Sequence, residues 1–305
     1  MSRSASARAN RRGEPPPSPE PLPAPALDSH THLDIVLGER PADDEHGEWA
    51  SEADVDAEIA AAAAVNVTRL VQVGVDVPSS RWSAALADRH PGVLAAVALH
   101  PNEAGAGRAT DEALAEIDRL AGLPRVRAVG ETGLDRFRTG PEGWVAQEAS
   151  FRAHIRIAKK HGIALVIHDR DAHEQILEVL EDEGAPEHTV FHCFSGDAAF
   201  AKACVERGYV LSFAGTLTFG NAAYLREAAA LTPAGQLLVE TDAPFLTPMP
   251  HRGRPNASRL VPLTVRALSE VTGIELTELC STLTANAERV FGRWEEGAHP
   301  APPRG

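Results

Sequence analysis

The stretch ALVIH at residues 164–168 decides the fold class, because four consecutive apolar side chains lead directly into a histidine. The stretches LVQVGV (70–75) and QLLVE (236–240) are also mainly apolar rather than alternating between apolar and polar residues. A strand that is buried on both faces has this pattern, and such strands are typical of parallel sheets. The sequence therefore indicates an α/β protein with a parallel sheet at its centre.

Working outward from these stretches, short apolar runs alternate with helical segments rich in Ala, Glu and Arg. The expected strands are residues 26–29, 68–75, 93–99, 127–130, 164–168, 189–192, 209–213 and 236–240. The expected helices include residues 55–64, 111–121, 144–161, 172–183, 198–207, 221–230, 260–272 and 277–291. About eight β/α units predict a (β/α)8 barrel of the TIM type. The alternative is an open doubly wound sheet, which usually carries a glycine-rich turn after its first strand, where this chain has DSHTHL.

Composition narrows the class of protein. The 305 residues include 43% hydrophobic side chains and carry a net charge of −14, so the broad basic surface of a chromatin protein or repressor is excluded. No apolar run approaches the ~20 residues that a membrane span needs. Three cysteines, Cys193, Cys204 and Cys280, form no CxxC pair, which favours a reducing compartment and a cytoplasmic protein.

The two ends differ from the body of the chain. Residues 1–26 contain EPPPSPEPLPAP and are expected to form a disordered Pro/Arg-rich tail, because proline blocks helix and sheet hydrogen bonding. Arg11 and Arg12 are followed by no apolar segment, which argues against a twin-arginine export signal. Residues 27–292 form the expected barrel domain, and residues 293–305 are expected to be a flexible C-terminal end.

Side chains capable of chemistry collect where the expected strands end. These are Asp28, His30 and His32 after the first strand, His100 at the third, Glu131 after the fourth, His168 at the fifth, His192 at the sixth and Asp242 after the eighth. In a barrel these ends meet at one mouth, where active sites are built. Each motif alone has a plain alternative, such as a chance His-x-His pair or a capping carboxylate. Burying the whole set unpaired would cost several kcal/mol for each group, whereas metal coordination satisfies it.

The number of ligands suggests more than one ion. Six side chains with one carboxylate able to bridge fit two divalent ions about 3.5–4 Å apart. Imidazole with carboxylate suits Zn or Mn, and Mg tolerates imidazole less readily. The choice among Mg, Mn and Zn stays open.

The motifs around these residues resemble those of the TatD family of metal-dependent deoxyribonucleases. The matching segments are DSHTHLD (28–34), ALHPNE (98–103), VGETGLD (129–135), VIHDRDA (166–172), FHCFSG (191–196), LVETDAPFLTP (238–248), RGRPNAS (252–258) and ANAERVFG (285–292). The resemblance implies a distorted amidohydrolase-like barrel that trims DNA 3′ ends. It also implies that His30, His32 and Asp242 hold one ion and that His168 and His192 hold the second, with Glu131 bridging the two.

Roles for the remaining residues follow from metal-assisted hydrolysis, in which ions lower the pKa of a water toward ~7. Asp242 is expected to orient that water and accept its proton, and His100 to contact substrate or protonate the leaving oxygen. Arg170 is expected to hold a phosphate oxygen, with an ion pair to a neighbouring aspartate as the alternative. Phe137 and Phe194 are candidates for stacking on a base, with ordinary packing as the alternative.

Two departures from the family pattern bear on substrate binding. Arg136 stands where the family often has an aromatic residue, and Gly220 lies in a loop where a basic residue is frequent. A positive rim of Arg136, Arg138, Arg170 and Arg252 would compensate for the acidic surface.

Three functions compete at this stage. The first is a nuclease acting on single-stranded DNA or DNA 3′ ends. The second is a hydrolase of small esters, lactones or amides, and the third is a non-catalytic binding protein in quality control. A monomer without membrane contact is expected.

Overall fold

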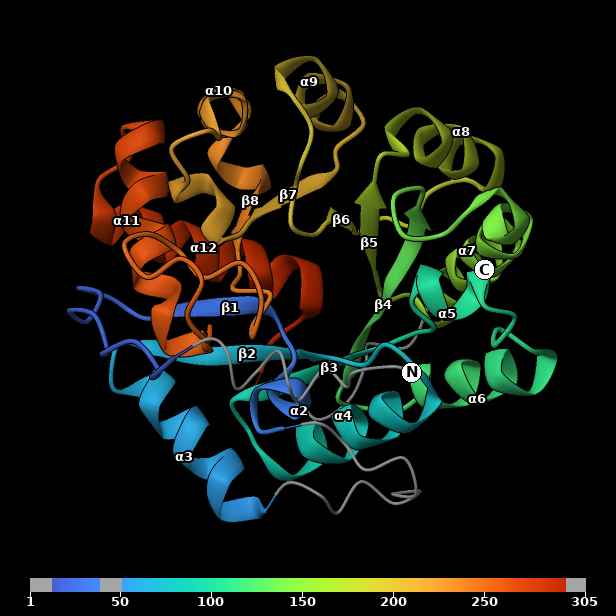
Figure 1. Cartoon of the computed structure of the whole chain (residues 1–305), viewed down its shortest axis with the longest axis horizontal. Helices are drawn as coiled ribbons and strands as arrows, with labels where there is room; N and C mark the ends of the chain where they lie inside the picture. Colours follow the sequence, from blue (N-terminus) through green and yellow to red (C-terminus); the bar gives the residue numbers. More distant parts are fainter. Residues whose placement is uncertain (1–12, 39–50, 295–305) are drawn as a thin grey trace.

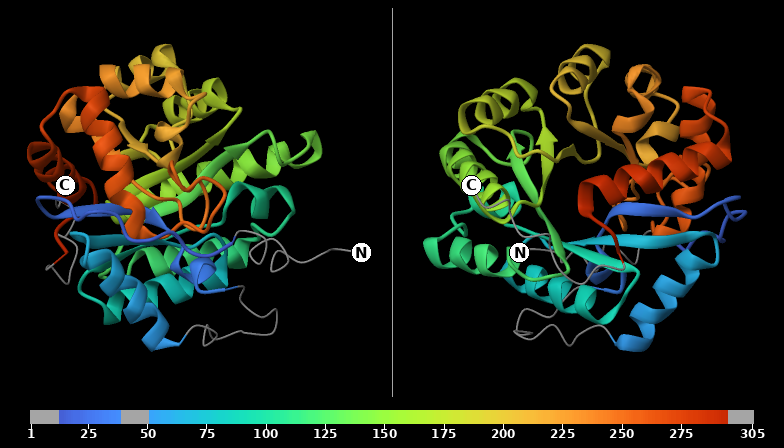
Figure 2. Two further views of the ribbon diagram at one scale, coloured as in Figure 1. Left: turned by 60° about the vertical axis from the view of Figure 1, so that its left-hand side comes forward. Right: turned by 180° about the vertical axis from the view of Figure 1, so that it is seen from behind.

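The computed structural model describes residues 13–38 and 51–294. Eight parallel strands pair in the order β1 to β8, each with its neighbour in sequence, and helices ring them on the outside (Figures 1 and 2). The prediction of a (β/α)8 barrel is confirmed. The strands are β1 (Ala26–Thr31), β2 (Val67–Val73), β3 (Val93–Val97), β4 (Val126–Asp135), β5 (Ala164–Arg170), β6 (Thr189–Phe191), β7 (Val210–Phe213) and β8 (Leu237–Val239).

The helices follow the strands, as the right-handed β/α crossover requires. They are α2 (Leu33–Val36), α3 (Glu52–Ala63), α4 (Val77–Arg89), α5 (Pro101–Gly105), α6 (Asp111–Ala121), α7 (Pro141–His161), α8 (His173–Glu183), α9 (Ala198–Glu206), α10 (Ala223–Leu231), α11 (Val261–Thr272) and α12 (Leu276–Phe291), with 3₁₀ turns η1 (Gly215–Thr218), η2 (Ala234–Gln236) and η3 (Ser258–Leu260). Along the described ranges, no helix is long and apolar enough to cross a membrane. All three cysteines are free thiols.

Strand β4 extends well beyond its expected end. It was expected to stop at residue 130, but it continues to Asp135 because it keeps pairing with β5, Gly133 opposite His168 and Asp135 opposite Arg170. Glu131 therefore lies within β4 rather than after it. Such a strand escapes propensity rules, because its last half carries polar side chains and glycines in place of β-branched residues.

The barrel closes between β1 and the segment after β8 through both side-chain and backbone hydrogen bonds. Asp28 lies inside β1 and is fully buried, and it accepts hydrogen bonds from the Thr241 backbone N–H (2.9 Å) and hydroxyl (2.5 Å). Burial raises the pKa of the Asp28 carboxyl to about 7. The Asp242 N–H donates to the His30 carbonyl at 2.9 Å. Asp28 therefore ties the two strands together rather than following β1 at the mouth.

The ends are more ordered than expected where the structure describes them. Residues 13–25 run over the barrel wall, with Leu22 buried and its N–H donating to the Val65 carbonyl at 3.2 Å. Arg254 donates to the Glu14 carbonyl at 2.8 Å, so this proline-rich segment, which has few N–H donors, is also held through its carbonyls. The expected disorder is wrong for this part of the tail. Arg11 and Arg12 lie outside the described residues.

The C-terminal end also begins later than expected. Trp294 is buried, and the Arg69 guanidinium lies 5.4 Å from its ring centroid. The Trp294 carbonyl accepts a hydrogen bond from Arg125 at 2.5 Å. Residues 293 and 294 therefore belong to the packed body, and residues 295–305 lie outside the described ranges.

Candidate metal centre

The structure brings together all six side chains that the sequence predicts as ligands. His30 lies in β1, His32 caps α2, Glu131 lies in β4, His168 lies in β5, and His192 and Asp242 follow β6 and β8. The strands are parallel, so their carboxyl ends share one mouth of the barrel. The side chains of His30, His32, Glu131 and His192 are each no more than 6% exposed, those of Asp242 and His168 15% and 20%, which leaves a narrow opening to solvent.

One group of ligand atoms surrounds the Oε2 atom of Glu131. This oxygen lies 3.5 Å from His30 Nε2 and 3.8 Å from His32 Nε2. Asp242 Oδ1 lies 3.9 Å and 3.5 Å from the same two nitrogens, which are 3.3 Å apart. A tetrahedral ion with bonds of about 2.1 Å has ligand atoms about 3.4 Å apart, so the atoms of His30, His32 and Asp242 have a spacing that suits one coordination shell, with Glu131 Oε2 close to both histidines.

A second group surrounds the other oxygen of Glu131. Its Oε1 atom lies 2.5 Å from His168 Nδ1, 2.8 Å from His192 Nε2 and 3.4 Å from His100 Nε2. One carboxylate thus presents one oxygen to each group of imidazoles. This is the arrangement expected of a carboxylate that bridges two ions.

The ionised carboxylates of the centre favour the binding of a cation. Burial alone raises the pKa of the Glu131 carboxyl, but the surrounding imidazoles, His192 first, hold it well below its usual range. Burial lowers the pKa of His32, yet the hydrogen bond to Asp242 and the nearby carboxylates raise it to about 9. Glu131 and Glu240 likewise overcome burial and raise the pKa of His192. The carboxylates therefore favour the protonated forms of His32 and His192, whereas burial lowers the pKa of His30, and a divalent ion can replace the protons.

His100 is oriented as a donor. Its Nδ1 accepts a hydrogen bond from the Asn102 N–H at 3.0 Å, where His100 caps α5. The proton of the neutral ring is therefore on Nε2, which points to Glu131. His100, Glu131 and His168 are close enough to hold an ion, but this tautomer suits a hydrogen-bond donor better than a ligand.

Of the residues expected to contact substrate at the mouth of the barrel, Arg170 and Phe137 are exposed and Phe194 is buried. Arg170 is exposed, and its guanidinium lies 4.7 Å from the ring centroid of Phe137, which is 66% exposed. Among the residues that the structure describes, no carboxylate forms an ion pair with Arg170. Phe194 is 2% exposed and stacks against Phe200, so the expectation that it stacks on a base is wrong. Its apolar ring completes the core.

Two of the other rim arginines, Arg136 and Arg252, also lie over aromatic rings. The Arg136 guanidinium lies 4.6 Å from the ring centroid of Trp144 on α7, and its Nε and Nη1 atoms are buried. Arg252 is exposed, 4.3 Å from the ring centroid of Phe219, and Arg138 is exposed at the end of β4. The expected rim of four therefore has three exposed arginines, because Arg136 packs on α7.

Sequence reasoning missed two carboxylates that contact the histidines. Asp135 Oδ2 lies 3.4 Å from His168 Nε2, and Glu240 Oε1 accepts a hydrogen bond from His192 Nδ1 at 3.1 Å. Both stand in motifs that contain predicted ligands, VGETGLD and LVETDAPFL. The available signal was the spacing: Asp135 stands four residues after Glu131, and Glu240 stands two residues before Asp242.

His154 is a third missed residue, and it supports His100 from behind. Its Nε2 accepts the Leu99 N–H at 3.0 Å, and its Nδ1 lies 2.7 Å from the Ser150 carbonyl. Burial lowers the pKa of His154 to about 4. The neutral ring fixes the backbone immediately before His100.

This burial predicts a pH-dependent stability. Between pH ~6.5 and ~4 the unfolded chain binds a proton at His154 and the folded chain does not, so the free energy of unfolding falls by up to about 3 kcal/mol as the pH drops. His154→Gln keeps an acceptor for Leu99 without the titration. Urea unfolding of the EDTA-treated proteins across this range should show a flatter profile for the variant. Parallel profiles would contradict the prediction.

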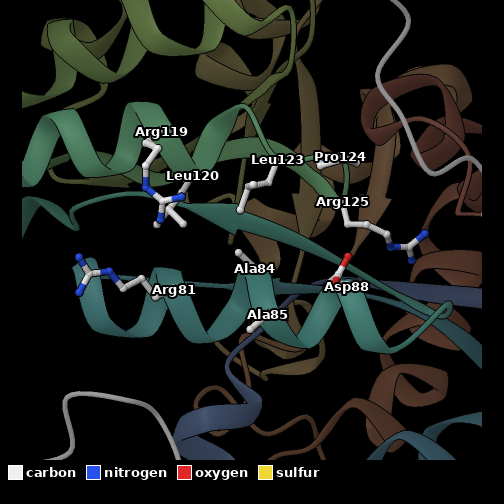
Figure 3. Close-up of a pocket in the computed structure, with 9 residues that line it drawn as sticks. All are labelled: Arg81, Ala84, Ala85, Asp88, Arg119, Leu120, Leu123, Pro124 and Arg125. Atoms are coloured by element: carbon white, nitrogen blue, oxygen red, sulfur yellow. The ribbon is translucent and has the colours of Figure 1, made fainter.

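A groove of about 310 Å³ lies away from the centre, between α4 and α6 (Figure 3). Its arginines are already satisfied. Arg81 and Arg119 both donate to Glu116, and Arg125 donates to the carbonyls of Ala87, Pro91 and Val93 among others. The contacts of Arg125 hold the start of β4 against α4. The arginines of the groove are therefore engaged in contacts within the protein.

Comparisons with known proteins agree with this geometry. Residues 27–292 match the family model described as TatD related DNase. The chain is 46% identical over 271 residues to the Mycobacterium tuberculosis protein named uncharacterized metal-dependent hydrolase TatD, covering 87% of this chain and 97% of that protein. It is 33% identical over 247 residues to the Citrobacter rodentium protein named 3′-5′ ssDNA/RNA exonuclease TatD, covering 78% of this chain and 92% of that protein.

A solved structure is also similar. The crystal structure of YJJV, a TatD homologue from Escherichia coli K12, superposes with a TM-score of 0.76 at 26% identity, covering 87% of this chain and 97% of that one. Fold, centre and sequence thus point to the same group of enzymes. The chain belongs to the TatD family of metal-dependent hydrolases.

Proposed function

We propose that this hydrolase is a nuclease that removes nucleotides from the 3′ end of single-stranded DNA. The observation that carries the proposal is the exposed Phe137 ring, stacked under the Arg170 guanidinium and next to the centre. An aromatic face and a cation side by side match a base and a phosphate. The name of the Citrobacter relative supports the same substrate class.

The proposed centre holds two divalent ions, of Mg, Mn or Zn. His30, His32 and Asp242 would hold one ion, and His168 and His192 the other, with Glu131 shared. When bound, such ions supply Lewis acidity, which acidifies water and neutralises charge on a phosphoryl group.

Protein groups supply the proton transfers. The hydrogen bond to His32 and the neighbouring imidazoles overcome burial and lower the pKa of Asp242, so its carboxylate is ionised at neutral pH. It can therefore orient a water molecule and accept its proton. His100 carries its proton on Nε2, which faces the centre, so it can contact the substrate by donating a hydrogen bond to the leaving oxygen.

The Phe137 side chain is positioned by the turn that follows β4. Asp135 Oδ1 accepts hydrogen bonds from the N–H groups of Phe137 (3.0 Å) and Arg138 (2.7 Å), while Asp135 Oδ2 lies 3.4 Å from His168 Nε2. The exposed ring is thus tied to the His168 side of the centre. On the other side, the Phe245 ring is 39% exposed, with its centroid 6.3 Å from that of His32. Partly exposed aromatic rings near both sides of the ligand set favour single-stranded bases, because in a duplex the faces of each base are covered by its stacked neighbours.

The test uses a 5′-labelled single-stranded oligonucleotide and the metal-loaded protein. We expect a ladder that shortens from the 3′ end and disappears with EDTA. Base stacking contributes about 1–3 kcal/mol, so Phe137→Leu should raise KM about tenfold or more. Val145→Ala is the matched control, since Val145 is 81% exposed on α7. Intact DNA alongside cleavage of an aryl ester or lactone would reject the nuclease in favour of a small-molecule hydrolase.

A further inference from the structure

We infer that Glu240 is a positioning residue that holds two of the proposed ligand histidines, His30 and His192, by their Nδ1 atoms. The inference rests on the proposed metal centre and adds to it a single carboxylate that orients one ligand from each ion's set. Glu240 lies directly after β8 and is fully buried.

The first half of the arrangement is a pair of hydrogen bonds to one oxygen. Glu240 Oε1 accepts from His192 Nδ1 at 3.1 Å and from the Cys193 N–H at 2.7 Å. The Glu240 backbone N–H donates to the Phe213 carbonyl at 3.1 Å, which fixes the residue to β7. The carboxylate is therefore rigidly placed, and its Oε1 atom is fully engaged.

The second half follows from the stacking of the two imidazoles. The rings of His30 and His192 lie 3.9 Å apart between centroids and are inclined by only 14°. Both direct Nε2 toward Glu131, at 3.5 Å for His30 and 2.8 Å for His192. With the rings nearly parallel and both Nε2 atoms near Glu131, His30 can present its Nδ1 on the side where His192 Nδ1 contacts Glu240.

Two buried atoms without partners complete the argument. Neither His30 Nδ1 nor Glu240 Oε2 has a hydrogen-bond partner among the described residues, although both are buried. One ring nitrogen of His30, one of His192 and one oxygen of Glu240 lie within 4.8 Å of one another. A hydrogen bond from His30 Nδ1–H to Glu240 Oε2 would satisfy both of the unpartnered atoms. Each oxygen of Glu240 then serves one histidine.

Through these contacts Glu240 would fix the tautomers of His30 and His192. A carboxylate that accepts from Nδ1–H keeps the lone pair on Nε2, directed into the centre, and increases its basicity. A role for Glu240 as a third metal ligand fits less well, because Oε1 already accepts two N–H groups.

The variant Glu240→Gln distinguishes the contact of residue 240 with His192 from its contact with His30. The glutamine oxygen can keep the His192 and Cys193 contacts, but its NH₂ group then faces His30 Nδ1, where an acceptor is needed. His30 should change to the Nε2–H tautomer and lose its lone pair toward the centre. The affinity of one of two Zn²⁺ ions should fall about 10–100-fold, and that of the other should change little.

Two measurements test this. Competition of Zn²⁺ against a chromophoric chelator gives the two affinities, and ¹H–¹⁵N correlation spectra of the Zn²⁺-loaded protein report slowly exchanging Nδ1–H protons. We expect such protons for His30 and His192 in the wild type, and for His192 alone in Glu240→Gln. Asp169→Asn is the matched control: Asp169 pairs with His173 Nδ1 at 2.6 Å, and His173 is outside the proposed ligand set. It should leave both affinities unchanged.

The outcomes separate the two proposals. Unchanged Zn²⁺ affinities and an unchanged His30 signal in Glu240→Gln would overturn the role of Glu240, whatever the substrate. Equal losses in Glu240→Gln and Asp169→Asn would also overturn it, since any buried carboxylate would then act alike. If the selective loss appears but DNA is not cleaved, the role of Glu240 stands and the nuclease proposal fails.

Discussion

Glu131→Gln is expected to lower hydrolytic activity by about 10³-fold and to leave the protein unable to hold two divalent ions at once. The reason is that Glu131 presents Oε2 to His30 and His32 and Oε1 to His168 and His192. Glutamine has one acceptor oxygen and no charge, so only one of the two groups keeps an oxygen ligand. The change keeps the size of the side chain, which limits effects on packing.

Metal content after dialysis, together with the rate of DNA cleavage, checks this expectation. Glu103→Gln is a suitable control, because Glu103 lies on α5 and pairs with Arg108, outside the ligand set. The control should retain wild-type metal content and activity. Two tightly bound ions in Glu131→Gln would mean that the carboxylate does not bridge.

Gly133→Ala is expected to destabilise the fold by roughly 4 kcal/mol. Gly133 has φ +139°, a backbone conformation that L side chains rarely adopt, and an added Cβ would lie 2.1 Å from the His168 carbonyl oxygen. Because Gly133 pairs with His168 in the sheet, the methyl group would push β4 away from β5. The displacement would also move His168 relative to Glu131 on the neighbouring strand.

Urea denaturation of the metal-free protein measures the loss. Gly107→Ala is the matched control, since Gly107 also has positive φ (+78°) but nothing within 4 Å of the added Cβ. It should cost about 1 kcal/mol, the part due to backbone conformation alone. Similar losses in both variants would show that the contact with His168 contributes nothing.

The sequence predicted that the candidate ligands lie together, because their positions obey a simple rule. His30, His168 and His192 stand at or near the ends of apolar runs, and parallel strands place those ends together. The rule works when the end of each strand is predicted to within about two residues. It therefore places these side chains at one mouth although the strand ends themselves are inexact, as β4 shows with its five extra residues.

The errors share a different cause. Residues 13–25 have few N–H groups and lack the apolar periodicity that predicts order, yet Arg254 and Arg266 from distant segments bind their carbonyls. Trp294 follows the last helix and looked like part of a frayed end, but it fills a site beside Arg69 and Phe291. Contacts between residues more than 200 positions apart leave no local pattern.

By itself, then, the sequence determined the barrel, its single domain-sized body and the six side chains at its mouth, because apolar strand periodicity and strand-end chemistry are local properties. Only the tertiary structure decided how these groups face each other. It divided the two oxygens of Glu131 between two groups of imidazoles, oriented His100 as a donor and placed Glu240 behind His30 and His192. Ring orientation and hydrogen-bond direction depend on which strands are neighbours and how far each is shifted along the barrel, and spacing along the chain does not encode that.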